Sequence, residues 1–198
     1  DLSREISEKL RLQFTGDEKQ RLTKRYTEDA EAYRLYLKGR YHWNKRSPES
    51  LQKAVEYFRK ALDKDPAYSL AYAGLADTYA HLSFFNVIAP QEAMPKAKTA
   101  AEQGLEIDKD LAEAHVSLGY ISFTYEGDWP TAGKHFEQAL TLNPAYSKAH
   151  TFYAFYLSSL GRSEEALEVA KRALDLDPAF LHRTAAPAGL LHFFRESL

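Results

Sequence analysis

The chain contains no cysteine among its 198 residues, which excludes disulfides and thiol chemistry. This absence fits a reducing compartment, and the cytoplasm is the predicted location. No apolar run reaches the roughly 18 to 20 residues that a membrane-spanning helix needs, so no membrane insertion is predicted. The N-terminus also lacks the pattern of a signal peptide.

Signatures of catalysis are also missing from the sequence. It has no glycine-rich phosphate loop, no nucleophile elbow and no pair of histidines on one helix turn. His115 and His150 occupy equivalent places in two repeats and are interpreted as packing residues, because a metal site would need a third and a fourth ligand. The sequence therefore predicts no enzyme, no cofactor and no metal site.

Charge is distributed unevenly along the chain. Its formal net charge of −2 divides into about +4 over residues 1–66 and −6 over residues 67–198. Nucleic-acid binders concentrate basic charge in one patch, whereas acidic residues interrupt the basic ones here throughout. No nucleic-acid binding by this segment is predicted. The hydrophobic content of 44% is enough for a core.

One pattern of residues does recur along the chain. Small or aromatic residues stand at offsets 0, 4 and 7, leucine stands at offset 8, and an end marker follows at offset 12. The end markers lie 43, 35 and 34 residues apart. A period near 34 is typical of stacked helix-turn-helix units. The four copies are Ala54, Phe58, Ala61, Leu62 and Pro66; Ala97, Ala101, Gly104, Leu105 and Lys109; Ala132, Phe136, Ala139, Leu140 and Pro144; and Ala166, Ala170, Ala173, Leu174 and Pro178.

A front helix precedes the pattern in each unit. Its apolar stripe includes a small residue, Ala76, Gly119 or Ala154, at which a neighbouring helix can approach closely. The prolines at three of the four end markers prevent continuation of the second helix.

These residues resemble the tetratricopeptide repeat (TPR). The resemblance implies an all-α, right-handed superhelix of stacked antiparallel helix pairs, with four repeats between residues 32 and 180. Two features depart from the family pattern: histidine replaces the usual aromatic in two front helices, and Lys109 replaces a proline. The expected repeat limits are 32–68, 69–111, 112–146 and 147–180.

Segments on both sides of the array also carry helical patterns. Leu2, Ile6, Leu10 and Phe14 are spaced four apart, and a second short helix is expected over residues 17–26. Short isolated helices are marginal in water, so residues 1–31 are expected to dock on the first unit as a cap, or to belong to an upstream domain. Residues 181–198 resemble a partial fifth repeat. With no initiator methionine, the chain is expected to be a piece of a longer protein.

Two units carry extra residues between their helices. The second unit has about nine, within residues 81–92, and Pro90 is expected to begin the following helix. The third has about one, within residues 126–130, where Trp129 is expected to fold back onto the helix pair.

Function in such arrays lies on the concave surface that successive front helices form. The resemblance implies groove positions beside the packing stripe, rich in aromatic rings, which can also simply fill space between helices. The Lys and Asn pattern of a carboxylate clamp is absent. The candidates are Tyr36, Arg40 and Trp43; Ala73, Asp77, Ala80 and His81; Val116, Tyr120 and Phe123; and Lys148, Thr151, Phe155 and Ser158.

The sequence thus predicts a non-catalytic scaffold that binds a protein or peptide. The segment from Asp1 to about Asp77 resembles the linker and first repeats of bacterial multidomain regulators, so a module of a larger regulatory or signalling protein is expected. Two alternatives stay open: self-association through the 81–92 insert or the C-terminal face, and regulation in cis of an upstream catalytic or DNA-binding domain.

Overall fold

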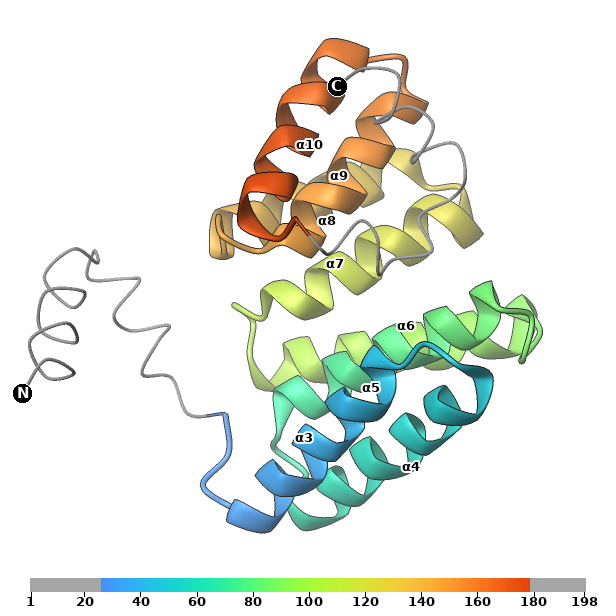
Figure 1. Cartoon of the computed structure of the whole chain (residues 1–198), viewed down its shortest axis with the longest axis vertical. Coiled ribbons are helices and arrows are strands. Elements are labelled where there is room, and N and C mark those ends of the chain that lie inside the picture. Colours follow the sequence, from blue (N-terminus) through green and yellow to red (C-terminus); the bar gives the residue numbers. More distant parts are fainter. Residues whose placement is uncertain (1–25, 179–198) are drawn as a thin grey trace, which may run out of the picture.

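The structure is a computed structural model in which residues 26–178 are described. No β-strand occurs in that range, and the helices keep the labels of Figure 1, which begin at α3. Their bounds are α3 Ala30–Asn44, α4 Pro48–Lys64, α5 Ser69–Phe84, α6 Pro90–Ile107, α7 Ala112–Ile121 with the π-helix η1 Ser122–Glu126, α8 Trp129–Leu142, α9 Ser147–Ser159 and α10 Ser163–Leu176. The predicted N-terminal helices and partial fifth repeat lie outside these residues.

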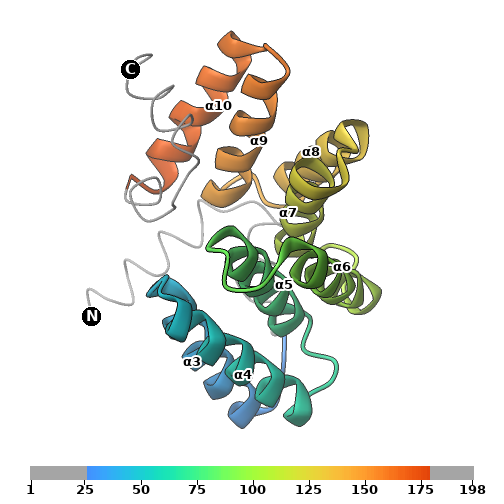
Figure 2. The same cartoon turned by 90° about the vertical axis from the view of Figure 1, so that its right-hand side faces the viewer.

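The described helices form four units that stack along a curve. Each front helix (α3, α5, α7 or α9) packs on the second helix of its own unit, and α5, α7 and α9 also contact the second helix of the preceding unit. Figures 1 and 2 show the units following one another from α3 and α4 in blue to α9 and α10 in orange. The predicted all-α superhelix is confirmed.

Phenylalanine rings in the second helices meet glycines in the front helices. A Cβ atom added at Gly39 would lie 2.6 Å from the Phe58 ring, and one added at Gly119 would lie 2.8 Å from the Phe136 ring. Both rings are fully buried. Only glycine permits this approach, so the recurring Phe and the small front-helix residue form one packing unit.

The second helices end in similar turns whether or not proline follows. The amide of Asp65 donates to Ala61 O at 2.9 Å, and the amide of Asp108 donates to Gly104 O at the same distance. Pro66 follows the first of these aspartates and Lys109 the second. The turn therefore does not depend on proline, and Lys109 does not change how the second unit ends.

The extra residues of the second unit mostly lengthen its helices. His81 to Phe84 continue α5, Pro90 begins α6 as predicted, and only residues 85–89 connect the two. Phe85, Val87 and Ile88 pack against the main core. The extra residues thus lie only partly between the helices, as residues 85–89, and apolar side chains of this connection pack against the core.

The single extra residue of the third unit is absorbed in η1. A π-turn holds one residue more than an α-turn, and Gly127 caps η1 with a left-handed φ of 71°. Trp129 follows and lies edge to face with Phe123 at 5.4 Å between ring centroids. Trp129 thus contacts the helix pair although it stays 37% exposed.

We predict that Gly119→Ala is less stable than Gly104→Ala by about 1–3 kcal/mol, the usual cost of overpacking a core. Both substitutions gain the same helix propensity, but a Cβ at Gly104 meets its nearest atom at 3.2 Å, in a flexible leucine side chain. Urea unfolding of the two variants measures the difference. Equal midpoints would show that the Phe136 ring moves aside freely.

Candidate interaction groove

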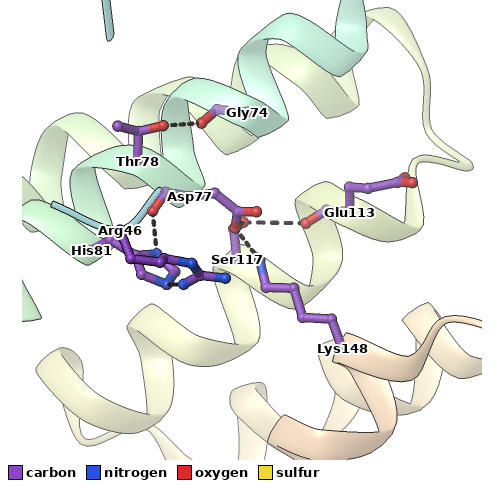
Figure 3. A network of polar contacts seen from close by, with 8 residues as sticks. All are labelled: Arg46, Gly74, Asp77, Thr78, His81, Glu113, Ser117 and Lys148. Carbon is purple, nitrogen blue, oxygen red and sulfur yellow. Dashed lines mark hydrogen bonds and ion pairs between the residues drawn. The ribbon is translucent and has the colours of Figure 1, made fainter. Parts of the chain in front are cut away.

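The centre of the inner face holds a buried ion pair between nonadjacent units. Lys148 Nζ on α9 donates to the Asp77 carboxylate on α5, and each side chain is only 6% exposed. Ser117 Oγ on α7 donates to the same carboxylate at 3.0 Å. Figure 3 shows these side chains converging from three front helices. Two of the predicted groove residues are thus joined to each other.

This ion pair keeps the Asp77 carboxyl group charged. Burial alone would raise the pKa of Asp77, but the charge of Lys148 and its hydrogen bond outweigh burial and lower it. A buried charge is stable only when it is paired and hydrogen-bonded. Asp77 and Lys148 satisfy each other, so neither is free to bind a ligand in this conformation.

Trp43 lies beside this pair with cations around its ring. The guanidinium groups of Arg46 and Arg40 stand 3.8 and 4.6 Å from the ring centroid, and Lys148 Nζ stands 5.8 Å away. Cations over an indole face are attracted by the ring quadrupole. Trp43 itself is 3% exposed, so the cations pack against a buried ring that has no contact with a ligand of its own.

His81 is held as a neutral imidazole. Its Nδ1 donates to Asp77 O at 2.8 Å, and its Nε2 accepts from Arg46 Nη1. Burial lowers its pKa to about 3, with the nearby charges of Arg46 and Lys148 acting in the same direction. Both ring nitrogens are therefore used inside the protein (Figure 3).

Aromatic rings of the third and fourth units form two edge-to-face pairs, which together we call the aromatic strip: Tyr120, Phe123, Phe152 and Phe155. Phe123 lies edge to face with Phe155 at 5.3 Å, and Tyr120 with Phe152 at 5.2 Å. All four side chains are partly exposed. The strip joins η1 and α7 to α9.

Val116 and Thr151, two further predicted groove residues, are also buried. Val116 is fully buried in a cluster with Ala139 and Ala149. Thr151 is 2% exposed, and its hydroxyl donates to Ser147 O at 3.0 Å. Val116 is thus covered by α9 of the next unit, and neither side chain can reach a ligand in this conformation.

The remaining candidates differ in exposure. Tyr36 is partly buried between Phe58 and Tyr68, at ring distances of 5.7 and 5.1 Å. Ala73 and Ala80 are buried, whereas Arg40 and Ser158 are partly exposed. Among the candidates, Arg40 and the aromatic strip are thus the best placed for contact with a ligand.

Sequence reasoning missed Ser117, Arg46 and Phe152. A signal for the ion pair was nevertheless present: Asp77 is the only Asp, Glu, Lys or Arg in α5, and Lys148 is the only one in α9. A lone charge in an otherwise uncharged, buried helix needs a partner of opposite sign. Matching such lone charges between repeats would have found the pair.

The histidines predicted to be packing residues do not meet each other. His115 Nδ1 lies 3.0 Å from His135 Nδ1, and His150 Nε2 donates to Pro144 O at 2.8 Å. Within residues 26–178, no three His, Asp or Glu side chains are placed to hold a metal ion. None of the helices described in that range is long and apolar enough to cross a membrane.

Comparisons with known proteins identify the class. Residues 123–185 match a family described as the tetratricopeptide repeat. A thermophilic TPR protein from Thermus thermophilus superposes with a TM-score of 0.65 at 21% identity, over 82% of each chain. The predicted resemblance to the tetratricopeptide repeat is confirmed, because residues 123–185 match that family and the described helices share the fold of a TPR solenoid.

Two further likenesses are informative. The chain is 31% identical over 156 residues to the transcriptional regulator HilA of Salmonella typhimurium, across 79% of this chain and 27% of HilA. It therefore spans about a quarter of that relative. The first TPR of Spaghetti (RPAP3), bound to an HSP90 peptide, has a TM-score of 0.52 at 18% identity, over 69% of this chain and 98% of that one.

We predict that Lys148→Met lowers the free energy of unfolding by about 3–5 kcal/mol, because it leaves the Asp77 carboxylate buried without its partner. The matched control is Lys96→Met in the exposed Lys96–Glu92 pair, with an expected cost below about 1 kcal/mol. Urea unfolding measures both. Similar costs for the two variants would contradict a buried ion pair.

We also predict that His81 makes the protein less stable in acid. Its folded pKa of about 3 lies below the unfolded value near 6.5. The unfolded chain therefore takes up the proton first, and stability falls as the pH drops from about 6.5 towards 3. The slope is up to about 1.4 kcal/mol per pH unit.

The His81→Gln variant lacks this titration, so it should lose about 1–2 kcal/mol less than the wild type between pH 7 and pH 5. Urea unfolding of both proteins at the two pH values gives the difference, and the other histidines cancel in it. Parallel losses would mean that His81 is not held neutral.

Proposed function

We propose that this chain binds a peptide or an extended segment of a partner protein along its concave face. The observation that carries the proposal is the aromatic strip, whose rings from two units are partly exposed and packed edge to face. Aromatic rings offer a large apolar area at a low entropic cost. The repeat family and fold support a protein-interaction module, and a binding scaffold rather than an enzyme.

The charges of the inner face indicate which ligands suit it. Lys148 is paired with Asp77, so it is not available as a clamp for a ligand carboxylate. Arg40 instead stacks on Trp43 at 4.6 Å and stays partly exposed. A ligand with apolar or aromatic side chains along the strip and one acidic residue near Arg40 fits this surface.

The biological setting is proposed from the relatives. HilA is a transcriptional regulator with sequence beyond the matched region, which supports a role as a module of a larger bacterial regulatory protein. In that setting the array acts on its parent domain in cis or recruits a separate partner. We propose a cytoplasmic location and no contact of this segment with nucleic acid.

Self-association is the second candidate, favoured by one observation. Phe84 ends α5 within the 81–92 insert and is 40% exposed, with its ring against Phe85 at 5.3 Å. An exposed phenylalanine at the end of a long helix pair can contact another copy. Light scattering over a concentration series decides this, because a monomer at all concentrations rules it out.

The groove is tested by selecting peptides from a random display library on the wild-type chain. We expect the Tyr120→Ala/Phe155→Ala variant to bind the selected peptides at least tenfold more weakly, because the strip loses two rings. The milder Phe155→Leu should show a smaller loss. Circular dichroism checks that each variant keeps its helices.

Phe84→Ala is the matched control, since it removes an exposed ring away from the strip. Its affinity should equal that of the wild type. If Phe84→Ala abolishes binding and the strip variant does not, the insert is the binding surface and the groove assignment is wrong.

A further inference from the structure

Exposed lysines without an ion pair gather on the helices of the first unit. Within residues 26–178, four lysines of α3 and α4 form no ion pair with a carboxylate: Lys38, Lys45, Lys53 and Lys60. In the later units of that range, such lysines stand one to a unit: Lys109, Lys134 and Lys171. The first unit therefore carries a concentration of positive charge that the other units lack.

Helical spacing places these lysines on one surface, together with two rings. On each of the two helices a lysine is followed by a ring four residues later and by a second lysine three residues after that, and such residues share one side of a helix. The two rings stack across the helices, with 5.3 Å between their centroids and 12° between their planes. We call these six residues the lysine patch: Lys38, His42, Lys45, Lys53, Tyr57 and Lys60.

Aromatic rings hold three of the ammonium groups in place. Lys38 Nζ and Lys60 Nζ lie 5.7 and 5.5 Å from the centroid of the Tyr57 ring. Lys45 Nζ lies 4.5 Å from the centroid of the Tyr41 ring, which is 59% exposed. A ring face attracts a cation, so the ammonium groups stay close together although like charges repel.

The pKa of His42 reports the positive charge of this surface. Burial lowers the pKa of His42, and the charges of Lys45 and Lys53 lower it further. His42 therefore stays neutral at pH 7 between charged lysines. An anion bound here would relieve the repulsion among those lysines.

The lysine patch faces away from the groove. Two residues, or about 200° of helix rotation, separate Lys38 from Tyr36, and the same holds for His42 and Arg40. Tyr36 and Arg40 are the groove candidates of α3. Figures 1 and 2 show α3 and α4 at one end of the array. A partner on the lysine patch thus leaves the groove open.

Neighbouring carboxylates limit which anion fits. Glu49 and Glu56 are exposed on α4 and stand four residues before Lys53 and Lys60. Nucleic acid carries a phosphate at every nucleotide, so some of its phosphates would meet these carboxylates. A peptide can place carboxylates at the lysines alone and lay apolar side chains on the exposed Tyr41 ring. Charge complementarity therefore favours an acidic peptide segment.

We propose that the lysine patch binds an acidic segment of a partner protein, with carboxylates at the lysines and apolar side chains against Tyr41 and Tyr57. This surface is separate from the groove, and the proposal does not rest on ligand binding there. The chain can accordingly hold two segments at once, an acidic one at its first unit and an apolar one along the aromatic strip.

Peptides selected on the wild-type chain from a display library restricted to Asp, Glu, Ser, Leu and Phe test this proposal. We expect selected peptides to bind the variant Lys53→Glu/Lys60→Glu at least tenfold more weakly, because two attractive contacts become repulsive. The matched control is Lys134→Glu/Lys171→Glu, which reverses two exposed lysines on α8 and α10 and changes the net charge equally. It should keep the wild-type affinity within about twofold. Circular dichroism checks the helices of both variants.

Three results would overturn the proposal. Equal losses in the two charge variants would mean that the peptides respond only to the net charge of the chain. Losses confined to the groove variant Tyr120→Ala/Phe155→Ala would mean that the acidic peptides lie on the aromatic strip. If a labelled single strand of oligo-dT binds and depends on Lys53 and Lys60 while the peptides do not, the surface takes nucleic acid.

Salt dependence provides a second measurement. Raising sodium chloride from about 50 to about 300 mM should weaken binding of the selected peptides at least fivefold, because salt screens exposed charges. The neutral variant Lys53→Gln/Lys60→Gln should bind more weakly and respond less to salt. Binding that is insensitive to salt and unchanged in this variant would contradict recognition by the lysines.

Discussion

The arrangement of the inner face depends on one interaction, the buried ion pair between Asp77 and Lys148. In a linear array of repeats, each unit is expected to contact only its neighbours. This pair instead joins the second unit to the fourth, with Ser117 of the third unit bonded to the same carboxylate. The array must therefore curve tightly enough for three front helices to converge at one point.

That curvature decides which side chains remain available for function. Lys148, which the sequence assigns to the groove, is used internally on Asp77, and Arg46 is used on His81 and Trp43. The partly exposed rings of the third and fourth units lie beside this network, with Lys148 Nζ 5.8 Å from the Phe152 ring centroid. These contacts are the reason for which we propose a ligand with apolar side chains, and no clamp of a ligand carboxylate by Lys148.

The fold was predictable because its determinants are local and repeated. The sequence alone shows Phe58 and Phe136 with the glycines of their front helices. It also shows the residues that end each second helix. Tertiary placement was not predictable: Val116 and Thr151 occupy groove positions of the family, yet both side chains are buried, and Val116 packs against Ala149 of the next unit. Ser117 looks ordinary in sequence, because its role arises only when a carboxylate 40 residues away approaches it.

Phe58 has a consequence for exchanging units between repeat proteins. Its ring faces a glycine of its own unit, Gly39, and a glycine of the next unit, Gly74. The place of Gly74 is taken in the fourth unit by Phe152, which packs against the cluster around Phe136. The boundaries are thus shaped individually. If the fourth unit stood in the place of the second, Phe152 would take the position of Gly74, where Phe58 leaves room only for a hydrogen atom. The units of this array are therefore not interchangeable modules.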